Sequence, residues 1–274
     1  MSHYYHKDGT SCYEVPMKSD PSKMRDTNLS DARQLDLLPS VTTYLQDMIA
    51  KPFLIEWGKN NVADACVTLP DNIWDLHRHE PDKLKELIRG QEREIVEKAQ
   101  KYGSVMHDQI ENFYSQDADL KIDPLIEAGF ERFKEWHLGE IREVVLSEYT
   151  VVGDAYAGRL DLLAYNHNGE LGLYDFKTRK RGRPTTKAEK LTGLGKFATY
   201  ETDIIQLGAY RKGINNTAGL PKPDFVANVF IDSNNPTPVH EHRWEPDKLE
   251  RFTQCWNHLV LAWGFLKDFY PANN

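Results

Sequence analysis

Two apolar runs separated by a short polar link constrain the fold of this chain more than any other feature. Both lie in the segment GRLDLLAYNHNGELGLYDFKTRKR, residues 158–181. The link, residues 166–169, has the length and composition of a β-hairpin turn. The segment therefore predicts two adjacent strands, and three charged residues, Asp161, Asp175 and Lys177, interrupt their apolar pattern.

The flanking segments predict an α/β fold. Apolar residues recur with helical spacing in residues 103–114, 124–138 and 199–215. Residues 144–152 and 224–231 are rich in β-branched residues, which is typical of strands. The expected order of helix, three strands, helix and strand predicts a small mixed sheet with helices on its faces.

We expect one large domain preceded by an irregular arm. Residues 1–39 contain turn formers and no sustained period, so they predict the arm, and a short helix is expected after Ser40. Residues 40–274 predict a single domain whose core spans about residues 100–232. The clearest helix is residues 246–269, with proline in its first turn and a continuous apolar stripe.

The composition excludes several classes of protein. Three widely spaced cysteines predict neither a disulfide framework nor a four-cysteine iron–sulfur cluster. The N-terminus does not resemble a signal peptide, and no apolar run approaches the length of about 18 residues that a membrane helix needs. We therefore expect a cytoplasmic protein without a membrane partner. The net charge of −8 argues against a protein that coats nucleic acid nonspecifically.

One segment departs from this acidic balance. Residues 177–196, KTRKRGRPTTKAEKLTGLGK, contain eight Lys or Arg residues and a single acid, Glu189. Their Gly, Pro and Thr content predicts a long loop directly after the charged strand. Two interpretations stay open here: a solvated loop, or an arm that contacts the phosphate backbone of a nucleic acid.

The three charges in the hairpin are expected to lie close together. Asp175 and Lys177 project from the same face of a strand, roughly 7 Å apart. A hairpin closed at residues 166–169 places Asp161 within about one residue of the position opposite Asp175. Two half-buried carboxylates repel each other and need a cation. That cation is either Lys177, in an ordinary ion pair, or a divalent metal with His107 as a nitrogen ligand. Taken alone, a histidine placed like His107 is more often a packed or surface residue.

Four short motifs resemble those of a known family. Residues 103–107 (GSVMH), 158–161 (GRLD), 175–178 (DFKT) and 206–210 (QLGAY) follow the order seen in PD-(D/E)XK nucleases of the RecB-like branch. The closest resemblance is to the mitochondrial genome maintenance exonuclease group and related phage exonucleases, which share a PSVT segment like residues 39–42. The resemblance covers residues 39–265, and its combination of motifs is specific although each motif is short.

The resemblance implies a restriction-endonuclease-like core with extra N-terminal and C-terminal helices, and it implies roles for individual residues. Lys177 resembles the catalytic lysine. Glu148 resembles an acidic position ahead of the G-x-x-D element, although a polar strand residue facing water is an equal interpretation. The implied ligands of one or two Mg²⁺ or Mn²⁺ ions are His107, Asp161, Asp175 and the Phe176 carbonyl.

Further positions are expected to meet DNA. Gln206 and Tyr210 resemble the Q-x-x-x-Y helix, which in this branch braces the site and contacts DNA, although Tyr210 could equally be a core residue. The basic residues expected to grip the backbone are Arg179, Lys180, Arg181, Arg183 and Lys187. One departure from the classical pattern is Leu160 in place of the proline before Asp161. The four-cysteine cluster of Cas4-like relatives is absent from the sequence, so no iron–sulfur cluster is expected.

The resemblance implies a metal-dependent DNA exonuclease that acts on free ends, with single-strand preference, in a bacterial or phage-infected cell. Replication or recombination proteins are expected partners. The alternatives are a catalytically inert DNA-binding module of the same fold, a structure-specific endonuclease and an RNase. A nucleotide-dependent enzyme is disfavoured because no Walker-type G-K-[ST] follows Gly193 and Gly195. A zinc hydrolase is disfavoured because the histidines lack H-E-x-x-H spacing.

Overall fold

A five-stranded mixed sheet forms the centre of the protein in this computed structural model, which describes residues 3–50, 52–115 and 121–271. The strand order is β5–β6–β7–β8–β9, and all neighbours are antiparallel except the parallel pair β7 and β8. The strands are β5 (Ile141–Val152), β6 (Ala157–Asn166), β7 (Leu171–Arg179), β8 (Phe225–Asp232) and β9 (His240–Arg243). The parallel pair needs a crossover connection, which contains helix α8 (Glu201–Asn216).

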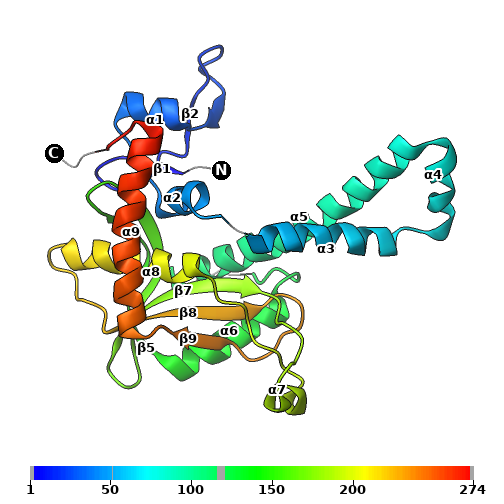
Figure 1. Cartoon of the computed structure of the whole chain (residues 1–274). Coiled ribbons are helices and arrows are strands. Elements are labelled where there is room, and N and C mark those ends of the chain that lie inside the picture. The colour runs from blue at the N-terminus through cyan, green and yellow to red at the C-terminus, as the bar shows by residue number, and fades with distance from the viewer. Residues whose placement is uncertain (1–2, 51, 116–120, 272–274) are drawn as a thin grey trace.

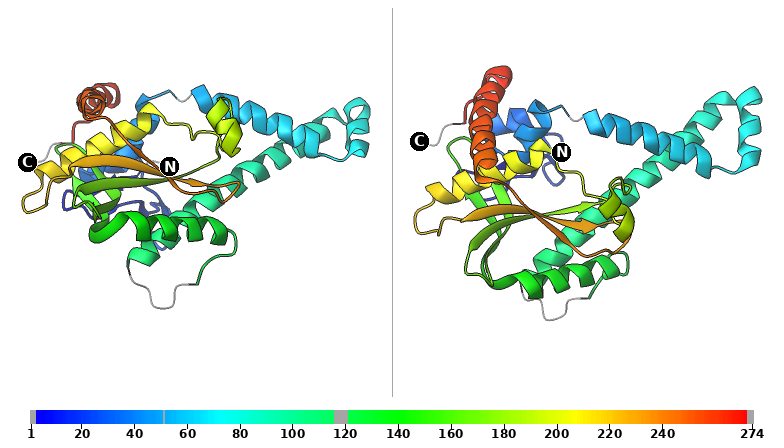
Figure 2. Two further views of the ribbon diagram at one scale, coloured as in Figure 1. Left: turned by 90° about the horizontal axis from the view of Figure 1, so that it is seen from below. Right: turned by 60° about the horizontal axis from the view of Figure 1, so that its bottom comes forward.

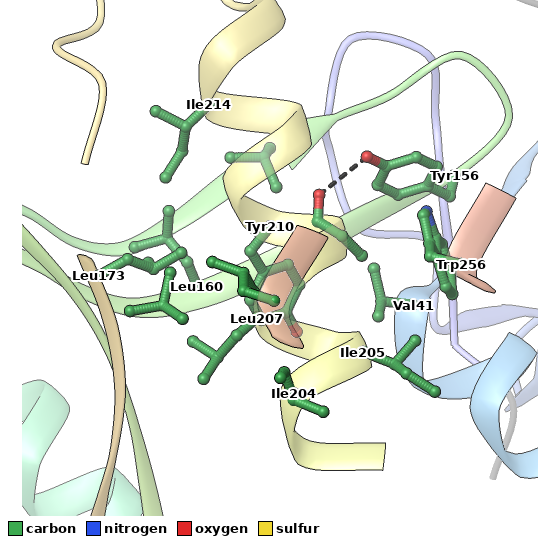
Figure 3. Packing of buried hydrophobic residues seen from close by; sticks show 14 of the residues in the cluster. Val41, Tyr156, Leu160, Leu173, Ile204, Ile205, Leu207, Tyr210, Ile214 and Trp256 are labelled. Carbon is green, nitrogen blue, oxygen red and sulfur yellow. Dashed lines mark hydrogen bonds between the residues drawn. The ribbon is translucent and has the colours of Figure 1, made fainter. Parts of the chain in front are cut away.

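Helices cover both faces of the sheet, so the protein belongs to the predicted α/β class (Figure 2). Helices α2 (Val41–Met48), α8 and α9 (Pro246–Lys267) pack on one face around a cluster that includes Leu160, Leu173 and Trp256. Figure 3 shows part of this cluster. Helices α5 (Pro81–Tyr114) and α6 (Glu127–Glu140) cover the other face. Because both faces are covered, β6 and β7 are buried along most of their length.

The predicted hairpin is present with the predicted turn. Strand β6 pairs with β7 from Tyr165 opposite Leu171 to Leu162 opposite Tyr174. The turn between them is closed by the Gly169 amide, which donates to the Asn166 carbonyl at 3.0 Å. The predicted C-terminal helix is α9.

Residues 3–39 are more ordered than the sequence predicted. Strand β1 (Tyr4–Tyr5) pairs with β4 (Leu38–Pro39), and β2 (Glu14–Pro16) pairs with β3 (Met24–Asp26). Helix α1 (Leu29–Leu35) follows a capping box. The prediction of an irregular arm was wrong because strands of two or three residues carry no readable period. Their order comes from burial against the rest of the chain, since Tyr4 and Tyr5 are buried.

A helical arm projects from the body of the molecule (Figure 1). It consists of α3 (Pro52–Thr68), η1 (Asp71–Asp75), α4 (Leu76–His79) and the first half of α5. The predicted helix of residues 103–114 is the C-terminal part of the single long helix α5. None of the helices in the described ranges is long and apolar enough to cross a membrane.

The basic segment is less of a loop than predicted. Strand β7 continues to Arg179, and a short helix, α7 (Lys187–Thr192), lies within the segment. Thr186 and Glu189 form a capping box at the start of α7. The single acid of the segment therefore has a local structural role, because its carboxylate accepts hydrogen bonds from the first backbone amides of that turn.

Candidate functional site

The polar residues of the hairpin meet where β6 and β7 separate, a place that we call the fork (residues 157–161 and 175–179). The last backbone pair between the strands is Leu162 with Tyr174. One residue further, the Asp161 Oδ2 atom accepts a hydrogen bond of 2.7 Å from the Phe176 amide. A side-chain carboxylate thus takes the place of a backbone carbonyl as the acceptor. This hydrogen bond holds Asp161 beside Asp175, as the hairpin register had predicted.

The fork is crossed by a row of polar residues, one from each strand. The register pairs Asp175 with Asn228 on β8, and Asn228 with His242 on β9. Glu148 on β5 falls between the pairs Ser147–Leu162 and Tyr149–Leu160, which puts it opposite Asp161. The row therefore contains three carboxylates on three adjacent strands, and their mutual repulsion is lowered by cations beside them. Its members are Glu148, Asp161, Asp175, Asn228 and His242.

Asp175 is buried, with 1% of its surface exposed, and both of its carboxylate oxygens contact neighbouring donors. The Lys177 Nζ atom donates to its Oδ1 at 2.9 Å and lies 2.7 Å from its Oδ2. The Asn228 Nδ2 atom donates to Oδ2 at 2.7 Å. Burial raises the pKa of the Asp175 carboxyl; the Lys177 ammonium opposes that shift and Asp161 adds to it. Burial alone would lower the pKa of Lys177, but Asp175 and Asp161 outweigh it and raise the pKa.

Helix α8 places Gln206 and Tyr210 behind the lysine. Lys177 donates to the Gln206 Oε1 atom at 3.2 Å, and the Gln206 Nε2 atom donates to the Tyr210 hydroxyl at 3.1 Å. Tyr210 is buried and lies in the cluster of Figure 3 beside Leu160 and Leu207. Burial raises the pKa of Tyr210 well above its ordinary value, so its hydroxyl stays protonated. Tyr210 is therefore a core residue whose hydroxyl also takes part in the polar chain with Gln206 and Lys177.

Glu148 lies in the site rather than in water. Its backbone φ is +49°, in the left-handed region, at an irregular point of β5. Its carboxylate lies 2.8 Å from the Arg159 Nε atom, and Arg159 also bonds the Glu111 carboxylate of α5. Burial raises the pKa of Glu148 to about 8, Asp161 adds to the shift, and Arg159 opposes it.

His107 lies on the helix face that is turned toward the fork. Residues 103, 107 and 111 of α5 are four apart and share one face of the helix. A Cβ atom on Gly103 would lie 3.1 Å from the Thr178 hydroxyl of β7, and Glu111 bonds Arg159 of β6. His107 sits between these two contacts, half-buried, without a hydrogen bond or ion pair to another described residue.

The expected three-donor metal group is assembled only in part. Within residues 3–50, 52–115 and 121–271, no three His, Cys, Asp or Glu side chains are gathered as metal ligands. The donors present still suit a hard divalent cation. Glu148 and Asp161 supply carboxylate oxygens, and the Asp161 Oδ1 atom accepts no hydrogen bond from a described residue.

The basic segment divides into residues tied into the fold and residues exposed to solvent. Arg179 makes two hydrogen bonds of 2.7 and 2.8 Å to the buried Asp203 carboxylate. Arg181 donates to the Thr237 hydroxyl at 2.8 Å and stacks on Phe197, with its guanidinium carbon 4.1 Å from the ring centroid. The cations of the predicted DNA set whose side chains are exposed are Lys180, Arg183 and Lys187.

Several residues of the site were missed at the level of sequence. Asn228 interrupts an apolar strand, DFVANVFI, in the same way that Asp161 interrupts its own, and this was the available signal. Trp244, whose indole bonds Asn228, carried no such signal. Arg159 lies within the G-x-x-D motif, but its partners Glu111 and Glu148 come from distant segments.

Comparisons with known proteins add little to this geometry. No protein-family model matches the chain, and no curated protein matches it. One similar solved structure, described as "Crystal structure of SSO0001", is 14% identical and covers 76% of this chain and 86% of its own. Its TM-score of 0.24 is too low to carry an argument about fold or function.

Proposed function

We propose that the protein is a divalent-metal-dependent deoxyribonuclease with a PD-(D/E)XK core of the RecB-like branch, acting on free DNA ends. The observation that carries the proposal is the convergence of Asp161, Asp175 and Lys177 at the fork, where two separate motifs, G-x-x-D and D-x-K, meet. Gln206, from the fourth motif, bonds the same lysine. Motifs that are distant in sequence share one hydrogen-bonded chain, which chance matches would not require.

The size of the kinetic barrier favours metal-assisted chemistry. Phosphodiester hydrolysis is so slow in water that an enzyme must lower the barrier by on the order of 20 kcal/mol. General acid–base assistance contributes roughly 3 to 5 kcal/mol. One lysine is therefore insufficient. A bound divalent ion supplies the larger part by activating a water molecule and neutralising charge on the scissile phosphate.

The residues of the fork have complementary roles in this proposal. Asp161, Asp175, His107 and the Phe176 carbonyl are the proposed holders of the ion, and Glu148 adds negative charge beside them. Lys177 stays protonated because both carboxylates raise its pKa, so its ammonium can orient the attacking water and offset negative charge as it develops. Gln206 fixes the direction of that ammonium, since it accepts one of its three protons.

The DNA strand would be held next to the fork by charge. Lys180, Arg183 and Lys187 are exposed and lie in the segment that follows Lys177 in the chain. Exposed cations in such a position attract phosphate groups and make binding sensitive to salt. The three cysteines are free, which fits the reducing cytoplasm that we propose as the protein's location.

The test compares the protein with an Asp175→Asn variant on end-labelled single-stranded, duplex and circular DNA. We expect release of mononucleotides from linear DNA only, with Mg²⁺ or Mn²⁺ and not with chelator. Asp175→Asn should lower the rate at least 100-fold, because it removes a carboxylate at the centre of the row.

A matched control is Asp31→Asn. Asp31 is also a buried acid with a cationic partner, in its case Arg25, but it lies on α1 and not at the fork. This variant should retain the activity of the unaltered protein. Equal activity in Asp175→Asn would refute the assigned site. Cleavage of circular DNA would indicate an endonuclease, and binding without cleavage would favour an inert DNA-binding module.

A further inference from the structure

Asp175 is contacted on its β8 side by a buried pair of residues that belongs to no sequence motif. Asn228 is fully buried and Trp244 is 6% exposed. The Trp244 Nε1 atom donates to the Asn228 Oδ1 atom at 2.7 Å, and the Asn228 Nδ2 atom donates to the Asp175 Oδ2 atom at 2.7 Å. Both distances are short for hydrogen bonds of this type, as expected for a well-aligned buried chain that ends on a carboxylate.

The tryptophan decides which way the asparagine points. A side-chain amide has a donor end and an acceptor end of almost equal size, so shape alone does not orient it. The indole N–H group can only donate. The oxygen of Asn228 must therefore face Trp244, which leaves its NH₂ group facing Asp175. With the opposite orientation, two donors would meet at the indole and two acceptors at the carboxylate.

The oriented amide in turn decides the plane of the carboxylate. Lys177 contacts both oxygens of Asp175 from one side, whereas Asn228 contacts only Oδ2. Without Asn228, the carboxylate could turn about its Cβ–Cγ bond and still satisfy the lysine. With Asn228 in place, the Oδ2 atom of Asp175 is held toward β8, so its Oδ1 atom points away from β8.

We propose that Trp244 and Asn228 are positioning residues that set the orientation of the Asp175 carboxylate for binding a divalent cation. This inference rests on the proposed function. Hydrogen bonds to a ligating carboxylate typically change metal affinity by 10- to 100-fold when they are removed. A chain that served only the stability of the fold would not change the affinity for a metal.

The test measures Mn²⁺ binding to the full chain by electron paramagnetic resonance of free Mn²⁺, without DNA and without turnover. The informative variant is Trp244→Phe, which keeps the aromatic ring and removes the N–H donor. We expect the dissociation constant for Mn²⁺ to rise about 10-fold or more. The matched control is Trp136→Phe, which removes an indole donor that bonds Glu241 instead. It should bind Mn²⁺ as the unaltered protein does.

The outcomes separate this inference from the proposed function. If the unaltered protein binds no Mn²⁺, the proposed function fails and takes the inference with it. If it binds Mn²⁺ and a folded Trp244→Phe variant binds equally well, the inference is overturned while the proposed function stands.

A second measurement needs no variant and covers the case in which Trp244→Phe does not fold. In the ¹⁵N-labelled protein, saturating Mg²⁺ should shift the Trp244 indole and Asn228 side-chain amide resonances and leave the Trp136 indole in place. Unmoved Trp244 and Asn228 resonances under saturating Mg²⁺ would overturn the inference.

Discussion

At the scale of single residues, the site depends on one close contact between two motifs. An added Cβ atom on Gly158 would lie 2.6 Å from the Tyr210 Cε1 atom and 3.0 Å from Val41. Gly158 opens the G-x-x-D motif and Tyr210 closes the Q-x-x-x-Y motif. The glycine is needed because the tyrosine ring lies against the backbone of β6, and the ring in turn carries the hydroxyl that bonds Gln206.

Gly158→Ala should therefore displace Tyr210 and disturb the chain that holds Lys177. We expect a loss of about 1 to 3 kcal/mol in the free energy of unfolding, because the ring is enclosed and cannot yield without repacking. The measurement is urea denaturation. Gly90→Ala is the control, since nothing lies within 4 Å of a Cβ atom there. In the interior of helix α5 it should stabilise by about 0.4 to 1 kcal/mol. Equal stability of Gly158→Ala and the unaltered protein would show that the contact is not tight.

At the scale of elements, ion pairs between an arginine and an aspartate connect strands to the helices that follow them. Arg25 of β3 makes hydrogen bonds of 2.6 and 2.8 Å to Asp31 of α1. The Asp31 carboxylate also accepts a hydrogen bond from the backbone N–H of Asn28 in the capping box. Arg179 of β7 makes the equivalent pair with Asp203 in the first turn of α8. In both cases an arginine on a strand fixes the start of a helix.

The Arg25–Asp31 pair makes a pH-dependent contribution to stability. The hydrogen bonds from Arg25 lower the pKa of Asp31 to about 2, below its ordinary value of 3.8. The folded state therefore binds this proton less readily than the unfolded state, and the stabilisation is present at neutral pH and lost as the pH falls toward 2. We expect Asp31→Asn to cost about 1 to 2 kcal/mol at pH 7 and clearly less at pH 3. Urea denaturation at both values tests this, and an equal cost at both would contradict it.

The basic segment offers two arginines with opposite expected effects. Arg179→Met leaves the buried Asp203 carboxylate without its partner and should cost about 3 kcal/mol of stability. Arg183→Met should leave stability unchanged, weaken DNA binding and lower the slope of log affinity against log salt by about 1. Denaturation and fluorescence titrations at several salt concentrations measure these quantities. If Arg183→Met leaves the salt slope unchanged, Arg183 does not contact phosphate.

At the scale of the whole molecule, the two layers of helices lie on opposite faces of the sheet, and residues from both layers approach the fork. Asp175 and Lys177 project toward α8, whereas the neighbouring side chains Tyr174 and Phe176 pack in the cluster beneath α5 and α6. His107 approaches from the α5 side. The site therefore requires both hydrophobic layers to be in place, and the separation of β6 from β7 gives access to residues from each.

Local pattern in the sequence was sufficient for the four strands β5 to β8, the turn at residues 166–169, the α9 helix and the α/β class. It was also sufficient for two short-range contacts, Asp175 with Lys177 and Gln206 with Tyr210. These depend only on the two-residue period of a strand and the nearly four-residue period of a helix, which the chain carries within a few residues. The proximity of Asp161 to Asp175 followed as well, because a short turn leaves little freedom in register.

Only the tertiary structure decided which residues complete the site. The partners Asn228 and Trp244, the contact of Gly158 with Tyr210, and the bonds of Arg159 to Glu111 and Glu148 all join segments that are far apart in the chain. The same holds for the division of the basic segment, because burial against Asp203 ties down Arg179 while Arg183 stays exposed. Such contacts depend on how separate elements pack and pair, and a local sequence pattern contains no record of which distant donor will meet a given acceptor.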